Sequence, residues 1–294
     1  MRFTEAVDDF LRVKRREGLT QSTLDGYRRT LAGFAKSLSE DDLALADRRA
    51  YDRFIDGFYE RGCSKATVAH HWRGLKVFSR WALDEKLIDD DPFTRMKAPK
   101  LDVRLHDNLI TRDDFDKLIA ACPPRTFAGR RDRAVLDFLY ETGVRVSELS
   151  GLRTDDVDLD AGRAKVWGKG SKERFVFFGP TTALAMEKYR QMFRRMWQKP
   201  DPYLFFVSIN LVPMTESMVR QMLLRRAKDA GVTRDVNPHA FRHAFATQFL
   251  RNGGDLNSLQ RLLGHANLAI VTRYLSLVTD DLAEKHARHS PLAR

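Results

Sequence analysis

Two histidines and an arginine lie close together in the segment NPHAFRHAFATQFL, residues 237–250. His239 and His243 are four residues apart, the spacing at which one helix presents two ligands to a zinc ion. A zinc hydrolase of that kind needs a carboxylate directly after the first histidine as general base, and Ala240 occupies that position. The guanidinium of Arg242, between the two histidines, would also repel a divalent cation. The sequence therefore does not favour a metal site here.

The same segment is better suited to binding a phosphate. Asn237 is a typical helix N-cap and Pro238 fits the first helical position, so a helix is expected to begin there. The unpaired N–H groups and the dipole of its first turn favour an anion. His239, Arg242 and His243 would share one face, and the fork of an arginine matches two phosphate oxygens. A polar surface face without function is the alternative for this helix taken alone.

Four further residues stand where elements begin or end. Arg145 follows a glycine turn in TGVRVSELSGL, and Lys169 lies at the tip of an expected hairpin in VWGKGSKERF. His265 follows a glycine-terminated helix in LLGHANLAIVTRYLSL, and Tyr274 comes nine residues later. Each has a structural alternative. Arg145 could pair with Glu148, and Lys169 could be a solvated turn residue. His265 could cap a helix, and Tyr274 could be a structural tyrosine.

The spacing of apolar residues indicates which elements carry these side chains. Residues 1–88 are expected to form four helices, because apolar residues recur every three or four positions between caps and glycines. These helices cover residues 3–18, 20–38, 48–62 and 64–87. The fourth carries a stripe that we assign to a hydrophobic core rather than to a ligand site: Trp72, Leu75, Phe78 and Trp81.

The helical periodicity stops in residues 89–105, which are rich in proline and aspartate and which we interpret as an interdomain linker. Residues 106–294 begin with helices, one capped by Thr111 and one ended by Gly143. The period changes to two within 156–179, where glycines mark two tight turns of a small antiparallel sheet. The sequence therefore predicts a mainly α protein with a small antiparallel sheet. Further helices are expected from about residues 180, 215, 238, 255 and 267.

The composition is that of a soluble globular protein. Of 294 residues, 43% are hydrophobic and 31% charged, and no apolar run approaches the roughly 20 residues that cross a bilayer. The only cysteines, Cys63 and Cys122, lack ligand spacing, which predicts a reducing, cytoplasmic setting. The net charge is +11, of which residues from 100 onward carry +9. Such a charge fits a nucleic-acid partner and, equally, a merely basic surface.

Taken in order, the six residues resemble the tyrosine recombinase (phage integrase) family. The pattern of that family is Arg, Lys, His-x-x-Arg, His and Tyr, and it is filled here by Arg145, Lys169, His239, Arg242, His265 and Tyr274. The flanking strings TGVRVSEL, GKGSKER, HAFRHAFAT and LLGHAN fit as well, and the resemblance covers nearly the whole chain. The N-terminal helices resemble the family's SAM-like core-binding domain. His243 is not one of the six, and we interpret it as structural.

The resemblance implies a site-specific DNA recombinase or integrase. Tyr274 would attack a scissile phosphate, giving a covalent 3′-phosphotyrosyl intermediate and a free 5′-hydroxyl, so neither ATP nor a metal is required. Lys169 would protonate the departing 5′ oxygen, and His239 would assist proton transfer from Tyr274. The phosphate oxygens would be bound by the remaining three: Arg145, Arg242 and His265.

The resemblance also implies how DNA is bound. A core-binding domain (1–88) and a catalytic domain (106–294) would form a C-shaped clamp on double-stranded DNA, as a homotetramer on two duplexes or together with a second recombinase. The segment after Tyr274 is expected to dock on a neighbouring protomer, with folding back on its own domain as the alternative. Five basic residues of the N-terminal helices could face DNA or could be solvated: Arg28, Arg29, Lys65, Arg73 and Lys76.

Several alternatives remain open. A Xer-type chromosome or plasmid dimer resolvase often has Thr-His after the tyrosine, whereas Tyr274 is followed here by Leu275-Ser276. That difference favours an integrase of a mobile element, and the compact length, without an arm-binding domain, favours a short recombination site. A type IB topoisomerase would share the chemistry. A non-catalytic DNA-binding relative would not need all six residues, and a metal-dependent nuclease would need clustered carboxylates.

Overall fold

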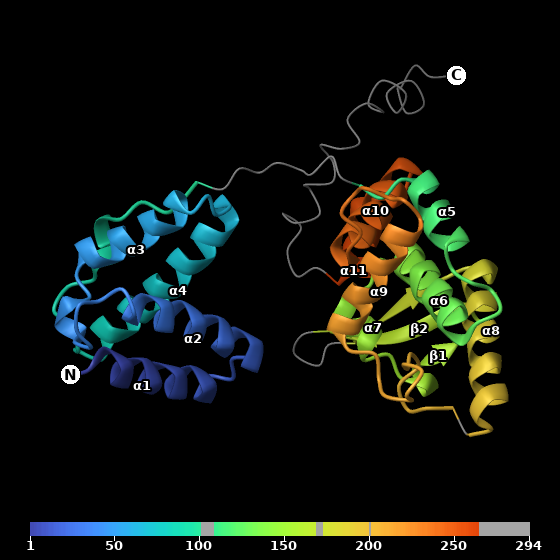
Figure 1. The fold of residues 1–294 in the computed structure, drawn as a ribbon, viewed down its shortest axis with the longest axis horizontal. Coiled ribbons are helices and arrows are strands. Elements are labelled where there is room, and N and C mark those ends of the chain that lie inside the picture. Colours follow the sequence, from blue (N-terminus) through green and yellow to red (C-terminus); the bar gives the residue numbers. More distant parts are fainter. Residues whose placement is uncertain (101–108, 169–172, 200, 265–294) are drawn as a thin grey trace, which may run out of the picture. The chain divides into compact units, whose positions relative to one another are not determined.

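The computed structural model describes residues 1–100, 109–168, 173–199 and 201–264 (Figure 1). The chain divides into two compact units, Met1–Arg104 and Leu105–Arg294, each with its own hydrophobic core. Among the helices of the described residues, none combines the length and apolar character that crossing a bilayer requires. The predicted fold class, mainly α with one small antiparallel sheet, is confirmed.

The first unit contains the four predicted helices. Each of the last three has a polar N-cap whose side chain accepts a hydrogen bond from a backbone N–H of the first turn: Thr20, Asp47 and Ser64. Their apolar faces meet in an aromatic core, in which Phe34 stacks on Tyr51 with ring centroids 4.4 Å apart. The predicted stripe of the fourth helix is buried in this core. The helices are α1 (Phe3–Arg16), α2 (Gln21–Ala35), α3 (Arg48–Glu60) and α4 (Lys65–Asp84), with a 3₁₀ turn η1 (Leu43–Leu45).

Part of the expected linker packs on the first unit. Pro92–Arg95 form the 3₁₀ turn η2. The Asp91 carboxylate accepts hydrogen bonds from the Ser79 hydroxyl at 2.7 Å and from the N–H of Phe93 at 3.0 Å. The Phe93 ring is buried against Tyr51, with centroids 4.9 Å apart. The sequence does not indicate this turn, because one capping aspartate and one buried ring produce no periodic pattern.

The second unit combines seven helices, among its described residues, with a three-stranded antiparallel sheet. The strands β1 (Val157–Asp158), β2 (Arg163–Trp167) and β3 (Glu173–Phe177) pair in that order. Gly162, with φ of +61°, lies in the predicted turn between β1 and β2. A 3₁₀ turn η3 (Thr154–Asp156) precedes the sheet. The helices are α5 (Arg112–Ala120), α6 (Phe127–Thr142), α7 (Val146–Ser150), α8 (Pro180–Trp197), α9 (Glu216–Asp229), α10 (Pro238–Arg251) and α11 (Leu256–Leu263).

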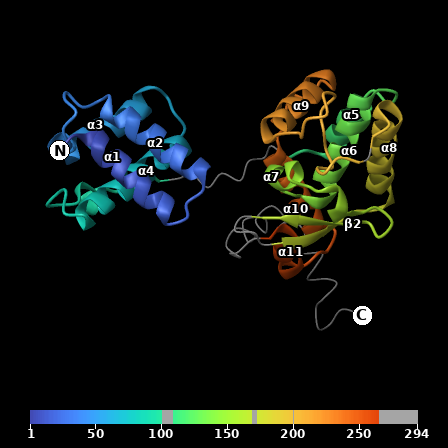
Figure 2. The same cartoon turned by 90° about the horizontal axis from the view of Figure 1, so that it is seen from below.

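Helix α6 is central to the second unit and packs against α8 and α10 (Figure 2). It begins at Phe127, because the Thr126 hydroxyl accepts a hydrogen bond from the N–H of Gly129 at 3.0 Å. It ends at Gly143 as predicted, where φ is +59°. The preceding helix α5 also begins as predicted, after the Thr111 cap.

The C-terminal part of α10 forms a small hydrophobic cluster with α11. We call this the satellite cluster; it consists of Ala246, Leu250, Leu259 and Leu263, with Phe245, Phe249 and Leu256 packed around it. The main core of the unit includes Phe241 and Ala244 from the first half of α10 but no residue of α11. Helix α11 also lies against β3. The two halves of α10 therefore belong to different cores.

Candidate active site

Helix α10 starts where the sequence predicts. The Asn237 side-chain oxygen accepts a hydrogen bond from the N–H of Ala240 at 2.9 Å, and Pro238 occupies the first turn. Arg242 is buried, with 5% of its surface exposed, whereas His239 and His243 are exposed. The helix thus buries Arg242 and presents its two histidines to solvent.

The guanidinium of Arg242 joins three segments of the second unit. Its Nη1 donates to the carbonyl of Gly143 at 2.7 Å, and its Nη2 donates to the carbonyl of Leu263 at 2.6 Å. Gly143 ends α6 and Leu263 is the last residue of α11. Because both of these acceptors are neutral, they fix the position of the guanidinium without cancelling its charge.

Arg145, at the N-terminus of α7, lies beside Arg242. Its Nη2 donates to the carbonyl of Gly264 at 3.3 Å, and Gly264 directly follows Leu263, which binds Arg242. Its Nη1 also pairs with Glu148 at 2.9 Å, the contact considered above as a structural alternative. The Arg145 side chain is 36% exposed. The structure therefore brings the two predicted phosphate-binding arginines to adjacent carbonyl groups.

Glu148 and Arg174 complete this cluster, although neither belongs to the six-residue pattern seen in the sequence. On β3, Arg174 donates from Nη1 to Glu148 Oε1 at 2.6 Å and from Nη2 to Oε2 at 2.8 Å. The Glu148 side chain has no exposed surface. Burial acts to raise its pKa, but Arg174 and Arg145 outweigh burial, so the pKa of Glu148 lies below its usual value. The three-residue spacing from Arg145 is the one sequence signal for Glu148.

His239 lies close to the same arginines. Although the residue is exposed, partial desolvation of its imidazole lowers its pKa, and the positive charges of Arg242, Arg220 and Arg145 lower it further. The imidazole is therefore neutral at neutral pH and can accept a proton. Arg220 of α9, which pairs with Glu216 at 3.0 Å, is a nearby cation outside the six-residue pattern.

Lys169, His265 and Tyr274 lie outside the described residues. Two of them lie close in sequence to residues of the cluster: Gly264 directly precedes His265, and Arg174 follows Lys169 by five positions. The structure thus brings three of the six predicted residues together, and the catalytic role of all six stays a prediction.

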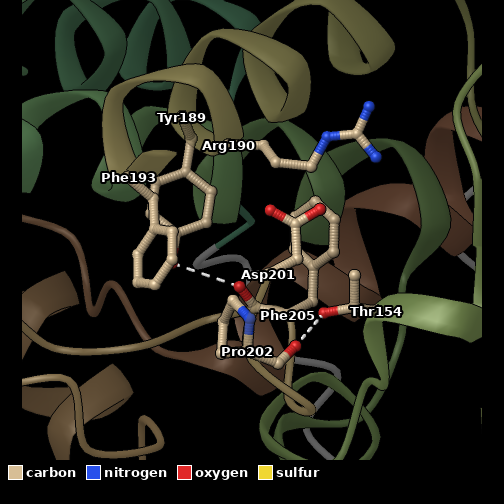
Figure 3. Close-up of a pocket in the computed structure, with 7 residues that line it drawn as sticks. All are labelled: Thr154, Tyr189, Arg190, Phe193, Asp201, Pro202 and Phe205. Atoms are coloured by element: carbon tan, nitrogen blue, oxygen red, sulfur yellow. Dashed lines mark hydrogen bonds between the residues drawn. The ribbon is translucent and has the colours of Figure 1, made fainter. Parts of the chain in front are cut away.

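A small cavity beside α8 does not suit a ligand (Figure 3). Its volume is about 10 Å³, which leaves room for about one water molecule. The Tyr189 hydroxyl beside it donates to the carbonyl of Phe205 at 3.1 Å and accepts from the N–H of Val207 at 3.0 Å. The Thr154 hydroxyl donates to the carbonyl of Pro202. These contacts join the loop after α8 to that helix and to the 3₁₀ turn η3.

Comparison with known proteins identifies the family of the chain. Residues 108–280 match the phage integrase family, and residues 6–89 match the phage integrase N-terminal SAM-like domain. The chain belongs to the phage integrase family of tyrosine recombinases. The resemblance seen in the six-residue pattern and in the N-terminal helices is confirmed.

Relatives of this tyrosine recombinase match over nearly its whole length. It is 32% identical over 296 residues to the tyrosine recombinase XerC of Bacillus pumilus, which covers 99% of this chain and 90% of the relative. It is 34% identical over 279 residues to the tyrosine recombinase XerD of Pseudomonas putida, which covers 94% of this chain and 93% of the relative. The predicted enzyme class, a site-specific DNA recombinase, is confirmed.

Solved structures share the fold of this tyrosine recombinase. The Tn1549 transposon integrase in complex with transposon right end DNA has a TM-score of 0.78 at 20% identity, covering 99% of both chains. A lambda integrase tetramer bound to a Holliday junction has a TM-score of 0.73 at 19% identity, covering 91% of this chain and 78% of the other. At these identities the likeness establishes the fold.

The first unit of the tyrosine recombinase contains a groove of about 540 Å³ between α2 and α4, which we call the α2–α4 groove. Three of the five predicted DNA-binding residues line it: Arg29, Arg73 and Lys76. The other two, Arg28 and Lys65, are exposed but are not among its lining residues. Contact of these residues with DNA stays a prediction.

Proposed function

We propose that this recombinase breaks and rejoins DNA strands by attack of Tyr274 on a phosphodiester, through a covalent 3′-phosphotyrosyl intermediate. The observation that carries the proposal is the placement of Arg145 and Arg242 on adjacent carbonyl groups, close to a neutral His239. Two guanidinium groups fixed side by side suit the two non-bridging oxygens of one phosphate.

In the cleavage step, the Tyr274 hydroxyl oxygen forms a bond to phosphorus and the bond from phosphorus to the 5′ oxygen breaks. The phenolic proton passes to His239, and Lys169 supplies a proton to the 5′ oxygen, which leaves as a hydroxyl. One phosphodiester is exchanged for another of similar energy, so the step needs no nucleotide. Rejoining is the reverse reaction with a 5′-hydroxyl as the nucleophile.

Cationic side chains stabilise the transition state in this proposal. Negative charge grows on the non-bridging oxygens as the phosphorus is attacked, and Arg145 and Arg242 offset it, with His265 as a further hydrogen-bond donor. The buried carbonyl contacts hold Arg242 in place before DNA arrives, so little reorganisation is needed during the reaction. Here cationic side chains stabilise the negative charge that metal ions stabilise in many phosphoryl-transfer enzymes.

For DNA binding, we assign residues 1–88 to the core-binding domain, 89–105 to the linker and 106–294 to the catalytic domain. The α2–α4 groove would face the duplex, because Arg29, Arg73 and Lys76 place positive charge along its walls. Arg28 and Lys65 would contact phosphates beside it. A C-shaped clamp of the two domains on the duplex follows from the same assignment.

For assembly, we propose a homotetramer on two duplexes. The fold shared with a lambda integrase tetramer bound to a Holliday junction supports this arrangement, and the segment after Tyr274 would dock on the neighbouring protomer. The enzyme would act in the cytoplasm, on DNA of the nucleoid. A role in a mobile element is supported by Leu275-Ser276 after the nucleophile, whereas similarity to XerC and XerD supports dimer resolution as a second candidate.

A covalent capture experiment tests the proposed chemistry. The recombination site is first selected as bound duplexes from a randomised DNA pool, and a nicked duplex carrying it is then incubated with the enzyme in EDTA. Cleavage releases a short fragment that diffuses away, so the adduct accumulates. Wild type is expected to form an SDS-resistant adduct, and Tyr274→Phe to form none, because phenylalanine has no hydroxyl oxygen to bond to phosphorus. The control Tyr203→Phe, which alters an exposed tyrosine of the same unit, is expected to behave as wild type.

Each other outcome contradicts a named part of the proposal. Absence of an adduct with wild type on a bound site would exclude the covalent mechanism. An adduct that persists in Tyr274→Phe would assign the nucleophile to another residue. Cleavage that requires added magnesium would indicate a metal-dependent nuclease. Relaxation of any supercoiled plasmid without site preference would indicate a type IB topoisomerase.

A further inference from the structure

We propose that Arg174 is a positioning residue of the active site, which holds Glu148 and the end of α11 and thereby sets the position and effective charge of Arg145. The inference rests on the proposed function, because Arg174 acts here on the cleavage step through Arg145.

Every nitrogen of the Arg174 guanidinium makes a hydrogen bond. The two Nη atoms bind the two oxygens of Glu148, at 2.6 and 2.8 Å, and Nε donates to the carbonyl of Leu262 at 2.7 Å. The side chain is 13% exposed. A methyl group added to Gly264 would lie 3.1 Å from the Cδ of Arg174, so the backbone at Gly264 lies against this side chain. Arg174 is therefore held by both α7 and α11.

The orientation of Arg174 on β3 is opposite to what hydrophobicity alone would select. Phe175 and Phe177 are exposed on the outer face of the sheet, whereas Arg174 and Val176 face inward. Across the sheet, Arg174 is paired with the buried Val166 of β2. Turning an arginine inward and two phenylalanines outward costs stability unless the inward charge is fully paired. The pairing with Glu148 meets that requirement.

The charge balance of the cluster depends on Arg174. The Glu148 carboxylate accepts four hydrogen bonds, two from Arg174 and two from the backbone N–H and the Nη1 of Arg145. Two arginines on one carboxylate leave a net charge of +1. Because the bidentate pair satisfies Glu148, the charge of the partly exposed Arg145 is available to a phosphate. Without Arg174, Glu148 would neutralise Arg145 instead.

Arg174 also links the segments that carry other predicted site residues. It follows Lys169 by five positions, and the Leu262 carbonyl that it binds precedes His265 by three. The three carbonyls at the end of α11 accept hydrogen bonds from three different arginines, in the order Arg174, Arg242 and Arg145. Arg174 therefore fixes the position of the end of α11 relative to the two phosphate-binding arginines.

The test compares Arg174→Gln and Arg174→Lys with wild type in single-turnover cleavage of the nicked duplex. We expect cleavage about 100-fold slower for Arg174→Gln, by analogy with loss of a transition-state donor. We expect about 10-fold slower cleavage for Arg174→Lys, which restores the charge but not the fork. The Kd for the duplex should change less than about twofold. The control is Arg163→Gln on the outer face of β2, where Arg163 pairs with Asp158 at 3.4 Å, and it should cleave as wild type.

A second substrate separates positioning from a fold defect. The scissile phosphate is replaced by each stereoisomer of a methylphosphonate, in which a neutral methyl group takes the place of one non-bridging oxygen. One stereoisomer should restore the cleavage rate of Arg145→Ala, relative to that of wild type, more than the other does. If Arg174 acts through Arg145, the same stereoisomer should restore the cleavage rate of Arg174→Gln. A merely destabilised variant would be slowed equally on all three substrates, which thermal unfolding of the free protein would also reveal.

The outcomes distinguish this inference from the proposed function. If wild type forms no adduct, the proposed function is wrong. If wild type forms an adduct and Arg174→Gln cleaves within twofold of it, Arg174 has no positioning role. Action through Arg145 would also be excluded if the opposite stereoisomer restored the cleavage rate of Arg174→Gln, or if this variant were slowed equally on all three substrates.

Discussion

Buried carboxylates of the second unit differ in how well they are paired. Asp132 is held by three arginine side chains: Arg131, Arg225 and Arg226. Glu148 is saturated by its arginines, and its pKa is lowered. Asp137 on α6 is different, because its Oδ2 has only a long ion pair with Arg133, at 3.5 Å, and no hydrogen bond. Burial raises the pKa of Asp137 to about 6. At this scale, Asp137 is a charge that destabilises the fold above that pH.

Asp137→Asn is therefore expected to stabilise the protein in a pH-dependent way. The folded state holds the Asp137 proton up to about pH 6, whereas the unfolded chain releases it near pH 4, so wild type loses stability between those values as pH rises. Asparagine stays neutral at every pH, so the variant does not lose stability in this way. The free energy of unfolding in urea should rise by on the order of 2–3 kcal/mol at pH 7.5 and by much less at pH 4.5.

The matched control for this change is Asp116→Asn on α5, whose exposed carboxylate pairs with Arg112 at 3.1 Å. Loss of that surface pair should alter the free energy of unfolding by less than about 1 kcal/mol. A destabilising effect of Asp137→Asn at pH 7.5, or an effect of equal size at both pH values, would contradict the assignment of an unfavourable buried charge.

At the scale of elements, sequence predicts what local chemistry determines. The predicted caps Thr111 and Asn237 and the stop at Gly143 are correct, because a cap acts on backbone groups within its own turn. Packing between distant segments leaves no such signal. The 3₁₀ turn around Phe93 is one example, and it lies within the expected linker.

The orientation of β3 is another example of what sequence does not predict. In the string ERFVF, alternation is evident, but hydrophobicity favours burial of Phe175 and Phe177 over Arg174. The structure has the reverse, because the partners of Arg174 are on α7 and at the end of α11, 26 and 88 positions away in the chain. The same reasoning explains why Glu148 could be recognised only as a local partner of Arg145.

Gly143→Ala tests the junction of α6, α7 and α10. The added methyl group would lie 2.6 Å from the Cδ1 of Phe245, and φ of +59° disfavours any side chain. We expect the free energy of unfolding to fall by about 2–4 kcal/mol, the sum of a left-handed backbone and overpacking. Cleavage should also slow, because the Gly143 carbonyl holds Arg242.

Gly231→Ala separates the two contributions. Gly231 has a similar φ of +66° but nothing within 4 Å of an added methyl group. Denaturant unfolding should show a fall in the free energy of unfolding of about 1–2 kcal/mol, from the backbone alone. The cleavage rate should be unchanged. Equal losses in the two variants would mean that the contact with Phe245 relaxes without cost.

At the scale of the whole molecule, charge is the dominant property. The net charge is +11, and most of it lies in the second unit, yet the α2–α4 groove gives the first unit a local basic surface. Binding to a polyanion should therefore weaken steeply with salt, since each neutralised phosphate releases a counterion. Which basic residues contact phosphate determines how steep the dependence is.

The double variant Arg73→Gln/Lys76→Gln is expected to flatten this salt dependence. If both side chains contact phosphates, the slope of log K against log salt should decrease in magnitude by up to about 2, measured by fluorescence anisotropy with a labelled duplex. Arg12→Gln/Arg48→Gln removes the same charge from α1 and α3, away from the groove, and should leave the slope nearly unchanged. Equal slopes for the two double variants would exclude the groove as the contact surface.

Because the satellite cluster is small, we expect α11 to open locally as a unit of its own. Its few apolar residues can come apart without disturbing the main core, so the free energy of local opening is smaller than that of global unfolding. The hydrogen bonds from Arg145 and Arg242 oppose this opening. In the proposed complex these arginines also bind the phosphate, and thermodynamic linkage then requires that DNA binding and the local folding of α11 shift each other by the same free energy.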